Sequence, residues 1–293
     1  MRSRSVLYDP PTPFISMNSF DFEKVLTIGA GGMIGSYVDF GYRPDQTTLD
    51  ILDADAVMEF VKKNNPSAII HLAGATDMVK TEQDPLYAYE LNVRGTYNVA
   101  QAATSVGATM VLASSSRVFD GHKKGPYTED DAPDPQTHYG RTKYMSELIV
   151  ASLVESYIIA RTAWVFGGGS DRDNKFYGKV LKQLRSGTEV TALYDVHGSP
   201  TYGKDFVATI KDLLEKGERG IFHIANAGTA TRFDLATAMA THVKPDAHVR
   251  AVDRSYFASS TTLPTNESIS SKRVALRPWQ EALAEYVSEE WKV

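Results

Sequence analysis

The amino-acid sequence predicts an α/β protein, a doubly wound parallel sheet with a smaller C-terminal lobe, and two observations support that prediction. Short apolar segments alternate with longer amphipathic ones from Lys24 to about residue 165, as in strands joined by right-handed helical crossovers. The first of these strands runs directly into a cluster of glycines. The alternation breaks after about residue 165, so the eight near-equal units of a closed barrel are not available.

The expected strands are short and apolar, as parallel strands covered on both faces tend to be. They are Lys24–Ile28, Thr47–Ile51, Ser67–Leu72, Thr109–Ser114, Tyr157–Thr162 and Gly220–Ala225. Longer segments with apolar residues at helical spacing predict the helices. These are the start of a helix over Met33–Phe40, and then Asp53–Lys63, Leu86–Val106, His138–Glu155 and Phe176–Arg185.

Three divisions of the chain are expected. Residues 1–20 contain three prolines and no helical or strand period, which indicates an irregular N-terminal extension. Residues 21–166 hold the regular alternation and form the sheet domain. Residues 167–293 begin with a glycine-rich polar loop and mainly form the smaller lobe, with segments that return to the sheet.

The composition narrows the class of protein. A chain of 293 residues with 42% hydrophobic and 23% charged residues is an ordinary globular protein. Its net charge of −5 provides no basic surface for nucleic acid, and no apolar run is long enough for a membrane span or a secretion signal. Without cysteine, disulfides and thiol nucleophiles are excluded, and no group of His, Asp and Glu has metal-ligand spacing. We therefore expect a cytoplasmic protein without a required metal.

The glycine cluster has the spacing G-x-x-G-x-x-G between a strand and a helix. Such a turn bends the chain sharply and lets backbone N–H groups approach a pyrophosphate, as in the Rossmann fold. A side chain at the middle glycine would keep the phosphate away. The sequence therefore predicts a dinucleotide-binding domain, with the cofactor held by Gly29, Gly32, Met33, Ile34 and Gly35.

The choice between NADPH and NADH stays open. A charged residue at the end of the second strand, roughly 20 residues further on, normally reads the adenosine ribose. Only Ser36–Thr48 separates the glycine turn from the strand carrying Asp50, which is too short for a full helix and a normal strand. Arg43 could meet a 2′-phosphate and slightly favours NADPH, although Arg43-Pro44-Asp45 could equally be a surface turn.

A serine, a tyrosine and a lysine form a candidate catalytic set. Tyr139 and Lys143 are four residues apart and therefore share one helix face. Ser114–Ser116 end a buried strand, at the carboxyl edge where open parallel sheets bind ligands. A nearby ammonium brings a tyrosine's pKa toward the working range, and a serine hydroxyl can hold the substrate oxygen. The set predicts proton transfer coupled to hydride transfer.

With these motifs in place, the sequence resembles the extended short-chain dehydrogenases/reductases, and within them the dTDP-4-dehydrorhamnose reductase family. The similarity runs from about Lys24 to near the C-terminus. The first and fourth of its motifs are shared by the whole superfamily, whereas the last two are typical of this branch. The motifs are Gly29–Gly35, Leu72–Thr76, Ser114–Gly121, Tyr139–Lys143, Arg161–Phe166 and Asp195–Thr201.

The resemblance implies a role for each matched residue. Ser115 would be the catalytic serine, Tyr139 the proton donor, and Lys143 the residue that binds the nicotinamide ribose. Trp164 would pack against the sugar, although a role in the core is the alternative. The remaining expected cofactor residues are Asp50 and Ile51 at the adenine, and Leu72, Ala73, Gly74 and Asn92 along the cofactor path. The remaining expected substrate residues are Thr76, Ser115, Ser116, Arg117, Pro200 and Thr201.

The sequence also departs from the family pattern. Ser116 and Arg117 replace the usual aspartate and tyrosine, and Val196 replaces a glutamine. Arg117 adds a positive charge at the mouth of the substrate site, where it either contacts a diphosphate or carboxylate or faces solvent. These changes leave the exact sugar nucleotide open.

The resemblance implies an NAD(P)H-dependent reductase that converts a nucleotide-diphospho-4-keto-6-deoxy sugar to the 4-hydroxy sugar, with a homodimer as a compatible assembly. A sugar-nucleotide 4-epimerase on the same scaffold is the first alternative. A dehydratase is disfavoured because Ser116 and Arg117 stand where an Asp-Glu pair is usual. A regulatory subunit with the reductase fold is the third alternative, and the intact catalytic set argues against it.

Overall fold

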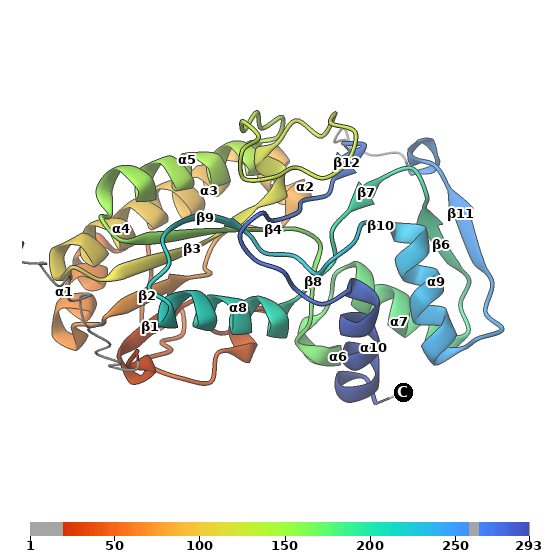
Figure 1. The fold of residues 1–293 in the computed structure, drawn as a ribbon, viewed down its shortest axis with the longest axis horizontal. Coiled ribbons are helices and arrows are strands. Elements are labelled where there is room, and N and C mark those ends of the chain that lie inside the picture. Colours follow the sequence, from red (N-terminus) through yellow and green to blue (C-terminus); the bar gives the residue numbers. More distant parts are fainter. Residues whose placement is uncertain (1–19, 258–263, 293) are drawn as a thin grey trace, which may run out of the picture.

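The central sheet is parallel and has the strand order β1-β2-β3-β4-β9 (Figure 1). The computed structural model describes residues 20–257 and 264–292. Strands β1 and β2 are buried along their whole length, which agrees with sequences that are apolar except for Thr27 and His71. The strands are Val25–Ile28 (β1), Ala68–His71 (β2), Thr109–Ser115 (β3), Tyr157–Thr162 (β4) and Gly220–His223 (β9). The predicted parallel α/β architecture is confirmed.

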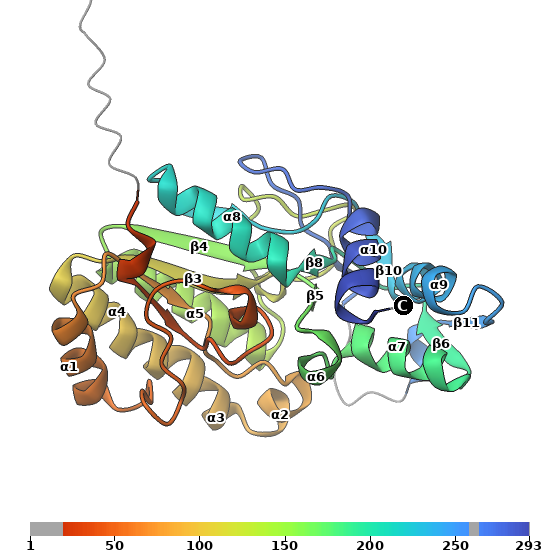
Figure 2. The ribbon, with the colours of Figure 1, turned by 90° about the horizontal axis from the view of Figure 1, so that it is seen from below.

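Helices cover both faces of this sheet. Ala54–Asn64 (α1), Gly95–Val106 (α4) and His138–Leu153 (α5) pack on one face. Gly203–Glu215 (α8) packs on the other (Figure 2). Helix α1 begins where the Asp53 carboxylate accepts a hydrogen bond from the Ala56 amide at 3.0 Å, a regular N-cap.

One expected helix and one expected strand are wrong. In place of a helix over Met33–Phe40, the structure has only a 3₁₀ turn, Gly35–Tyr37, because Val38 and Phe40 turn into the core on the α8 face of the sheet. Thr47–Ile51 forms a loop rather than a strand. There the Asp45 carboxylate accepts bonds from the Thr47 and Thr48 hydroxyls and the Thr48 amide, each at 2.8 Å, and such local bonds compete with strand pairing.

Beyond β1, on the side away from β2, the sheet continues only as a single β-bridge. Tyr42 pairs with Leu26, donating its amide hydrogen to Val25 O at 2.8 Å and accepting from Thr27 N at 2.8 Å. The chain then returns to the opposite side of β1 to form β2. The strand order therefore reverses at β1, and ligands bind open sheets at such a switch point.

The helix expected over Leu86–Val106 is present but interrupted. Pro85–Tyr89 (α3) leads through a π-helical turn, Glu90–Arg94, into α4. The short helix Met78–Gln83 (α2) precedes it. Single π-helical turns are common at functional sites, and this one contains the buried Asn92.

A second lobe lies at the opposite end of the molecule from α1 and α4 (Figure 1). Its core joins helices α7, α9 and α10. Its helices are Gly169–Arg172 (α6), Phe176–Ser186 (α7), Arg232–Val243 (α9) and Trp279–Glu290 (α10). Its strands are Val165–Phe166 (β5), Val190–Leu193 (β6), His197–Gly198 (β7), Thr201–Tyr202 (β8), Ala230–Thr231 (β10), Val249–Val252 (β11) and Asn266–Glu267 (β12).

The chain passes between this lobe and the sheet several times. Strand β9 and helix α8 follow residue 167 in sequence but belong to the central sheet and its cover. Residues 1–19 of the expected N-terminal extension lie outside the described part of the chain. Within the described part, no helix is long and apolar enough to cross a bilayer, and no three His, Asp or Glu side chains gather in a way that could hold a metal ion.

Candidate active site

The glycine turn forms a backbone cradle at the carboxyl end of β1. Gly29 has φ +90°, and a Cβ atom there would lie 2.6 Å from the Ala73 backbone nitrogen, so the loops after β1 and β2 touch only because this residue is glycine. Among the described residues, the Met33 and Ile34 amides have no hydrogen-bond acceptor in the protein. Free N–H groups on a glycine turn fit a pyrophosphate, so this cradle suits a dinucleotide.

Asn92 ties the loop after β2 to helix α5, which carries Tyr139 and Lys143. Its Oδ1 accepts from the Ala75 amide at 2.7 Å, and its Nδ2 donates to Thr142 Oγ1 at 2.9 Å. The side chain is 2% exposed and its amide is committed to these partners. Asn92 therefore fixes the conformation of the loop that contains Ala73 and Gly74. This structural role accounts for its buried position without a direct contact with the cofactor.

Tyr139 and Lys143 lie in the first two turns of α5, whose start is fixed twice. The Thr137 hydroxyl accepts from Gly140 N at 3.1 Å, and the Glu82 carboxylate accepts from His138 N at 2.7 Å. Each of these bonds satisfies an amide that the helix itself cannot pair. The position of Tyr139 is therefore set by groups from two elements.

Ser115 reaches Tyr139 through a close approach of two elements. A 3₁₀ turn, Ser116–Val118, follows β3 and packs against α5. A Cβ atom at Gly140 would lie 2.2 Å from Arg117 O, so no other residue allows this contact. The Ser115 hydroxyl acts on the pKa of Tyr139, and the structure thus brings these two residues together.

Burial dominates the electrostatics of this set. It raises the pKa of Tyr139, while the Ser115 hydroxyl and the Arg117 charge lower it. Burial lowers the pKa of Lys143 to about 8, although Glu147 raises it. Burial and the Lys143 charge lower the pKa of His71 to about 3, so His71 is neutral. Lys143 Nζ has no hydrogen-bond partner among the described residues, and a ribose with two hydroxyls would supply acceptors for it.

Arg117 is paired with Glu267, a residue that the sequence motifs do not mark. Its Nη2 lies 2.7 Å from Glu267 Oε1, and Trp164 Nε1 donates to Glu267 Oε2 at 3.1 Å. Both charges influence the pKa of Tyr139. Arg117 therefore neither faces solvent nor stands alone. No motif marked Glu267, because it joins the site only through the pairing of β12 with β7.

Arg232 is the second residue that the sequence analysis missed. Its guanidinium carbon lies 3.8 Å from the centre of the Trp164 ring and 4.6 Å from that of Phe176. Burial lowers the pKa of Arg232, and among the described residues its guanidinium has no hydrogen-bond or ion-pair partner. An uncommitted guanidinium over Trp164, which itself bonds Glu267 of the Arg117 pair, is ready to bind an anion.

The remaining expected site residues lie either in buried positions or at the surface. Ile51 is 5% exposed and packs in the core, whereas Asp50 and Thr76 are exposed. Pro200 and Thr201 are buried. The Thr201 amide donates to Trp164 O at 3.4 Å, so these two residues support the backbone that presents Trp164.

Comparison with known proteins identifies the family. The model of the RmlD substrate-binding domain matches residues 23–291. A dTDP-4-dehydrorhamnose reductase of Mycolicibacterium smegmatis is 34% identical over 91% of this chain and 85% of its own length. The spore coat polysaccharide biosynthesis protein SpsK of Bacillus subtilis is 30% identical over 91% of this chain and 97% of its own.

The solved structures agree with the sequence relatives. The dTDP-4-dehydrorhamnose reductase of Bacillus anthracis in complex with NADP superposes with a TM-score of 0.85 at 28% identity, covering 90% of this chain and 98% of that one. The predicted resemblance is thereby confirmed, and the reductase interpretation is favoured over the epimerase and regulatory ones. The chain belongs to the RmlD substrate-binding domain family, and it is an NAD(P)-dependent oxidoreductase with the extended short-chain dehydrogenase/reductase fold.

Proposed function

We propose that this protein reduces the 4-keto group of a nucleotide-diphospho-4-keto-6-deoxy sugar, as its reductase relatives do with dTDP-4-dehydrorhamnose. The observation that carries the proposal is the Ser115 hydroxyl beside Tyr139, with Lys143 one turn further along α5, on a sheet whose first strand runs into the glycine turn. Arg43, which is exposed at the edge beyond β1, favours NADPH over NADH as the reductant.

The proposed chemistry is a hydride transfer coupled to a proton transfer. Bound NAD(P)H would supply the hydride to the carbonyl carbon. Tyr139 keeps its proton because burial raises its pKa, and it gives that proton to the carbonyl oxygen as the alcohol forms. The Ser115 hydroxyl holds the same oxygen by a hydrogen bond. The Lys143 ammonium, one helical turn away, stabilises the phenolate that remains.

The substrate's diphosphate has a natural partner in Arg232. Its guanidinium lies over the rings of Trp164 and Phe176, and these contacts restrict its orientation before an anion arrives. A planar guanidinium binds phosphate through paired hydrogen bonds. We therefore assign Arg232 to the diphosphate and the Arg117–Glu267 pair to the sugar, beside Trp164.

The division of the chain into a cofactor domain over residues 21–166 and a mainly substrate-binding lobe over residues 167–293 belongs to the same proposal. So do a cytoplasmic location and a homodimer. Tyr97, Met145 and Leu148 are at least 40% exposed on the neighbouring helices α4 and α5, and a second copy would cover them. Sedimentation of the purified protein measures this assembly directly.

A panel of substrates tests the activity. Purified protein is mixed with dTDP-, UDP-, GDP- or CDP-4-keto-6-deoxy sugars and NADPH or NADH, and the loss of absorbance is followed. Tyr139→Phe should abolish turnover and leave cofactor binding nearly intact. Wild-type rates in Tyr139→Phe would show that the proton donor is misassigned. Cofactor that stays bound through purification, without net oxidation, would favour the epimerase.

A further inference from the structure

The glycine loop of this chain lacks the helix that normally follows it. In dinucleotide-binding folds that helix packs on the sheet and holds the loop against the pyrophosphate. Here a three-residue turn, Gly35–Tyr37, takes its place. Ser36 N donates to Gly32 O at 3.0 Å and Tyr37 N donates to Ile34 O at 3.1 Å. The loop is therefore linked directly to Tyr37, and whatever holds Tyr37 holds the loop.

Tyr37 is fixed by the second lobe. Its hydroxyl donates to Glu290 Oε1 at 2.6 Å and accepts from the Gly168 amide at 2.6 Å. A Cβ atom at Gly203 would lie 2.7 Å from the Tyr37 ring, so the start of α8 packs tightly on that ring. Residues from three separate parts of the chain thus meet the side chain that ends the cofactor loop.

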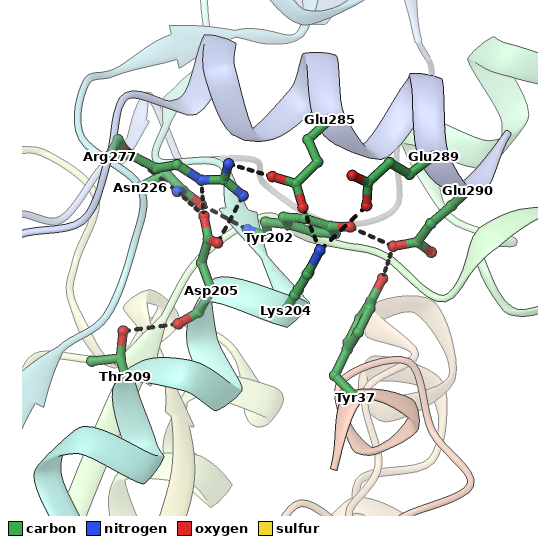
Figure 3. A network of polar contacts seen from close by, with 10 residues as sticks. All are labelled: Tyr37, Tyr202, Lys204, Asp205, Thr209, Asn226, Arg277, Glu285, Glu289 and Glu290. Atoms are coloured by element: carbon green, nitrogen blue, oxygen red, sulfur yellow. Dashed lines mark hydrogen bonds and ion pairs between the residues drawn. The ribbon is translucent and has the colours of Figure 1, made fainter. Parts of the chain in front are cut away.

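Glu290 is a shared acceptor. The Tyr202 hydroxyl donates to the same oxygen at 2.5 Å, and the two tyrosine rings meet edge to face with centroids 5.6 Å apart (Figure 3). Burial and the Glu290 carboxylate raise the pKa of Tyr37 and of Tyr202 above the ordinary value. Both hydroxyls therefore keep their protons and remain donors across the pH range in which an enzyme works.

The helix that carries Glu290 is itself anchored to α8. Lys204 Nζ lies 2.5 Å from Glu285 Oε1, and the Arg277 guanidinium makes two bonds of 2.8 Å to the Asp205 carboxylate (Figure 3). Arg277 also contacts Glu285. These contacts join α8 and α10, so Glu290 is presented to Tyr37 from a fixed position.

We propose that Tyr37 is a positioning residue for the cofactor, and that its bond to Glu290 holds the glycine loop in place of the missing helix. The inference rests on the proposed role of that loop. It makes affinity for the cofactor's pyrophosphate depend on α10, an element that contributes nothing to the cradle itself. Tyr202 provides a matched comparison, because it bonds the same carboxylate oxygen but does not lie in the loop.

The test compares Tyr37→Phe with Tyr202→Phe. Each variant removes one hydroxyl from Glu290 and keeps its ring. NADPH binding is titrated by fluorescence, 2′-AMP binding by calorimetry, and Tm is recorded for each protein. Tyr37→Phe should raise the Kd for NADPH roughly five- to tenfold, since a hydrogen bond to a charged group is lost. The Kd of Tyr37→Phe for 2′-AMP, which has no pyrophosphate, should stay within twofold of the wild-type value. For Tyr202→Phe, the Kd values for both NADPH and 2′-AMP should stay within twofold of wild type.

A second variant distinguishes the loss of the bond from misfolding of the protein. Glu290→Gln keeps the size of the side chain and an acceptor oxygen, and it should raise the Kd for NADPH by a smaller factor, roughly two- to fivefold. Equal Kd values for NADPH in Tyr37→Phe and Tyr202→Phe, or an equal loss of 2′-AMP and NADPH, would overturn the inference. Failure of the wild-type protein to bind NADPH would instead reject the proposed cofactor site.

Discussion

Glu147 and Arg161 form a bidentate ion pair, with side chains that are 3% and 2% exposed. Arg161 donates to both carboxylate oxygens, at 2.9 and 2.6 Å, and the Ser114 hydroxyl donates to Glu147 Oε1 at 2.5 Å. Ser114 is the neighbour of Ser115, and Glu147 is one turn beyond Lys143. The ion pair joins α5 to β4, and the Ser114 bond ties α5 to β3, the strand that carries Ser115.

Breaking this pair should destabilise the protein strongly. Glu147→Gln leaves the Arg161 charge buried without its counter-ion, which costs about 3–5 kcal/mol of the free energy of unfolding. Urea unfolding measures that loss. The double variant Glu147→Leu/Arg161→Met removes both charges and should recover a large part of it. If the double variant is less stable than the wild-type protein by the full sum of the losses measured for Glu147→Leu and Arg161→Met alone, the two residues do not act as a pair.

Cofactor binding should take up a proton near pH 8.5. Burial holds the pKa of Lys143 at about 8, below that of an exposed lysine, so the free enzyme is mainly deprotonated there at pH 8.5. Contacts with ribose hydroxyls favour the ammonium and raise this pKa. Calorimetry of NADPH binding in buffers of different ionisation enthalpy measures the uptake, which should vanish in Lys143→Met. The lowered pKa of Lys143 also has a consequence for the protein without cofactor. Its free energy of unfolding should increase as pH rises from about 8 toward the pKa of lysine in the unfolded chain, because the unfolded state then binds more protons than the folded one.

Removal of the Arg117 charge and removal of the Glu267 charge should shift the dependence of kcat on pH in opposite directions. Arg117 lowers the pKa of Tyr139 and Glu267 raises it. A proton donor fails as pH rises through its pKa, so Glu267→Gln should bring the alkaline decline of kcat to lower pH. Arg117→Gln should move the decline to higher pH. Shifts of the same sign would mean that the two charges do not act on Tyr139 directly.

Arg232 should govern substrate affinity rather than chemistry. Arg232→Met keeps the contact with Trp164 and removes the charge, so KM for the sugar nucleotide and the inhibition constant of dTDP should both rise roughly tenfold or more. Thymidine, which has no phosphate, should bind equally to both proteins. Arg273→Met gives a control outside the site, since the Arg273 guanidinium carbon also lies over a ring, 3.7 Å from the centre of Phe222, although this guanidinium is paired with Glu218. A fall in kcat with KM unchanged would place Arg232 elsewhere in the reaction.

Local signals predicted most of the sheet and part of the site. Buried strands such as β2 and β3 were recognisable because both faces are apolar, and Tyr139 and Lys143 because four residues make one helical turn. The short connection after the glycine turn is visible in the sequence, but the helix predicted over Met33–Phe40 is wrong because Val38 and Phe40 enter the core directly. Glu267 and Arg232 could not be found, since only tertiary pairing brings them to Trp164.

The bond between Tyr37 and Glu290 spans 253 residues of sequence. During synthesis at about 5–20 residues per second, Glu290 emerges on the order of tens of seconds after the glycine turn has left the ribosome. During that time the glycine loop of the nascent chain lacks the bond between Tyr37 and Glu290. On the proposed role of Tyr37, full affinity for the cofactor is reached only once the chain has been made as far as Glu290, so a product truncated before Glu290 should bind NADPH more weakly than the complete protein.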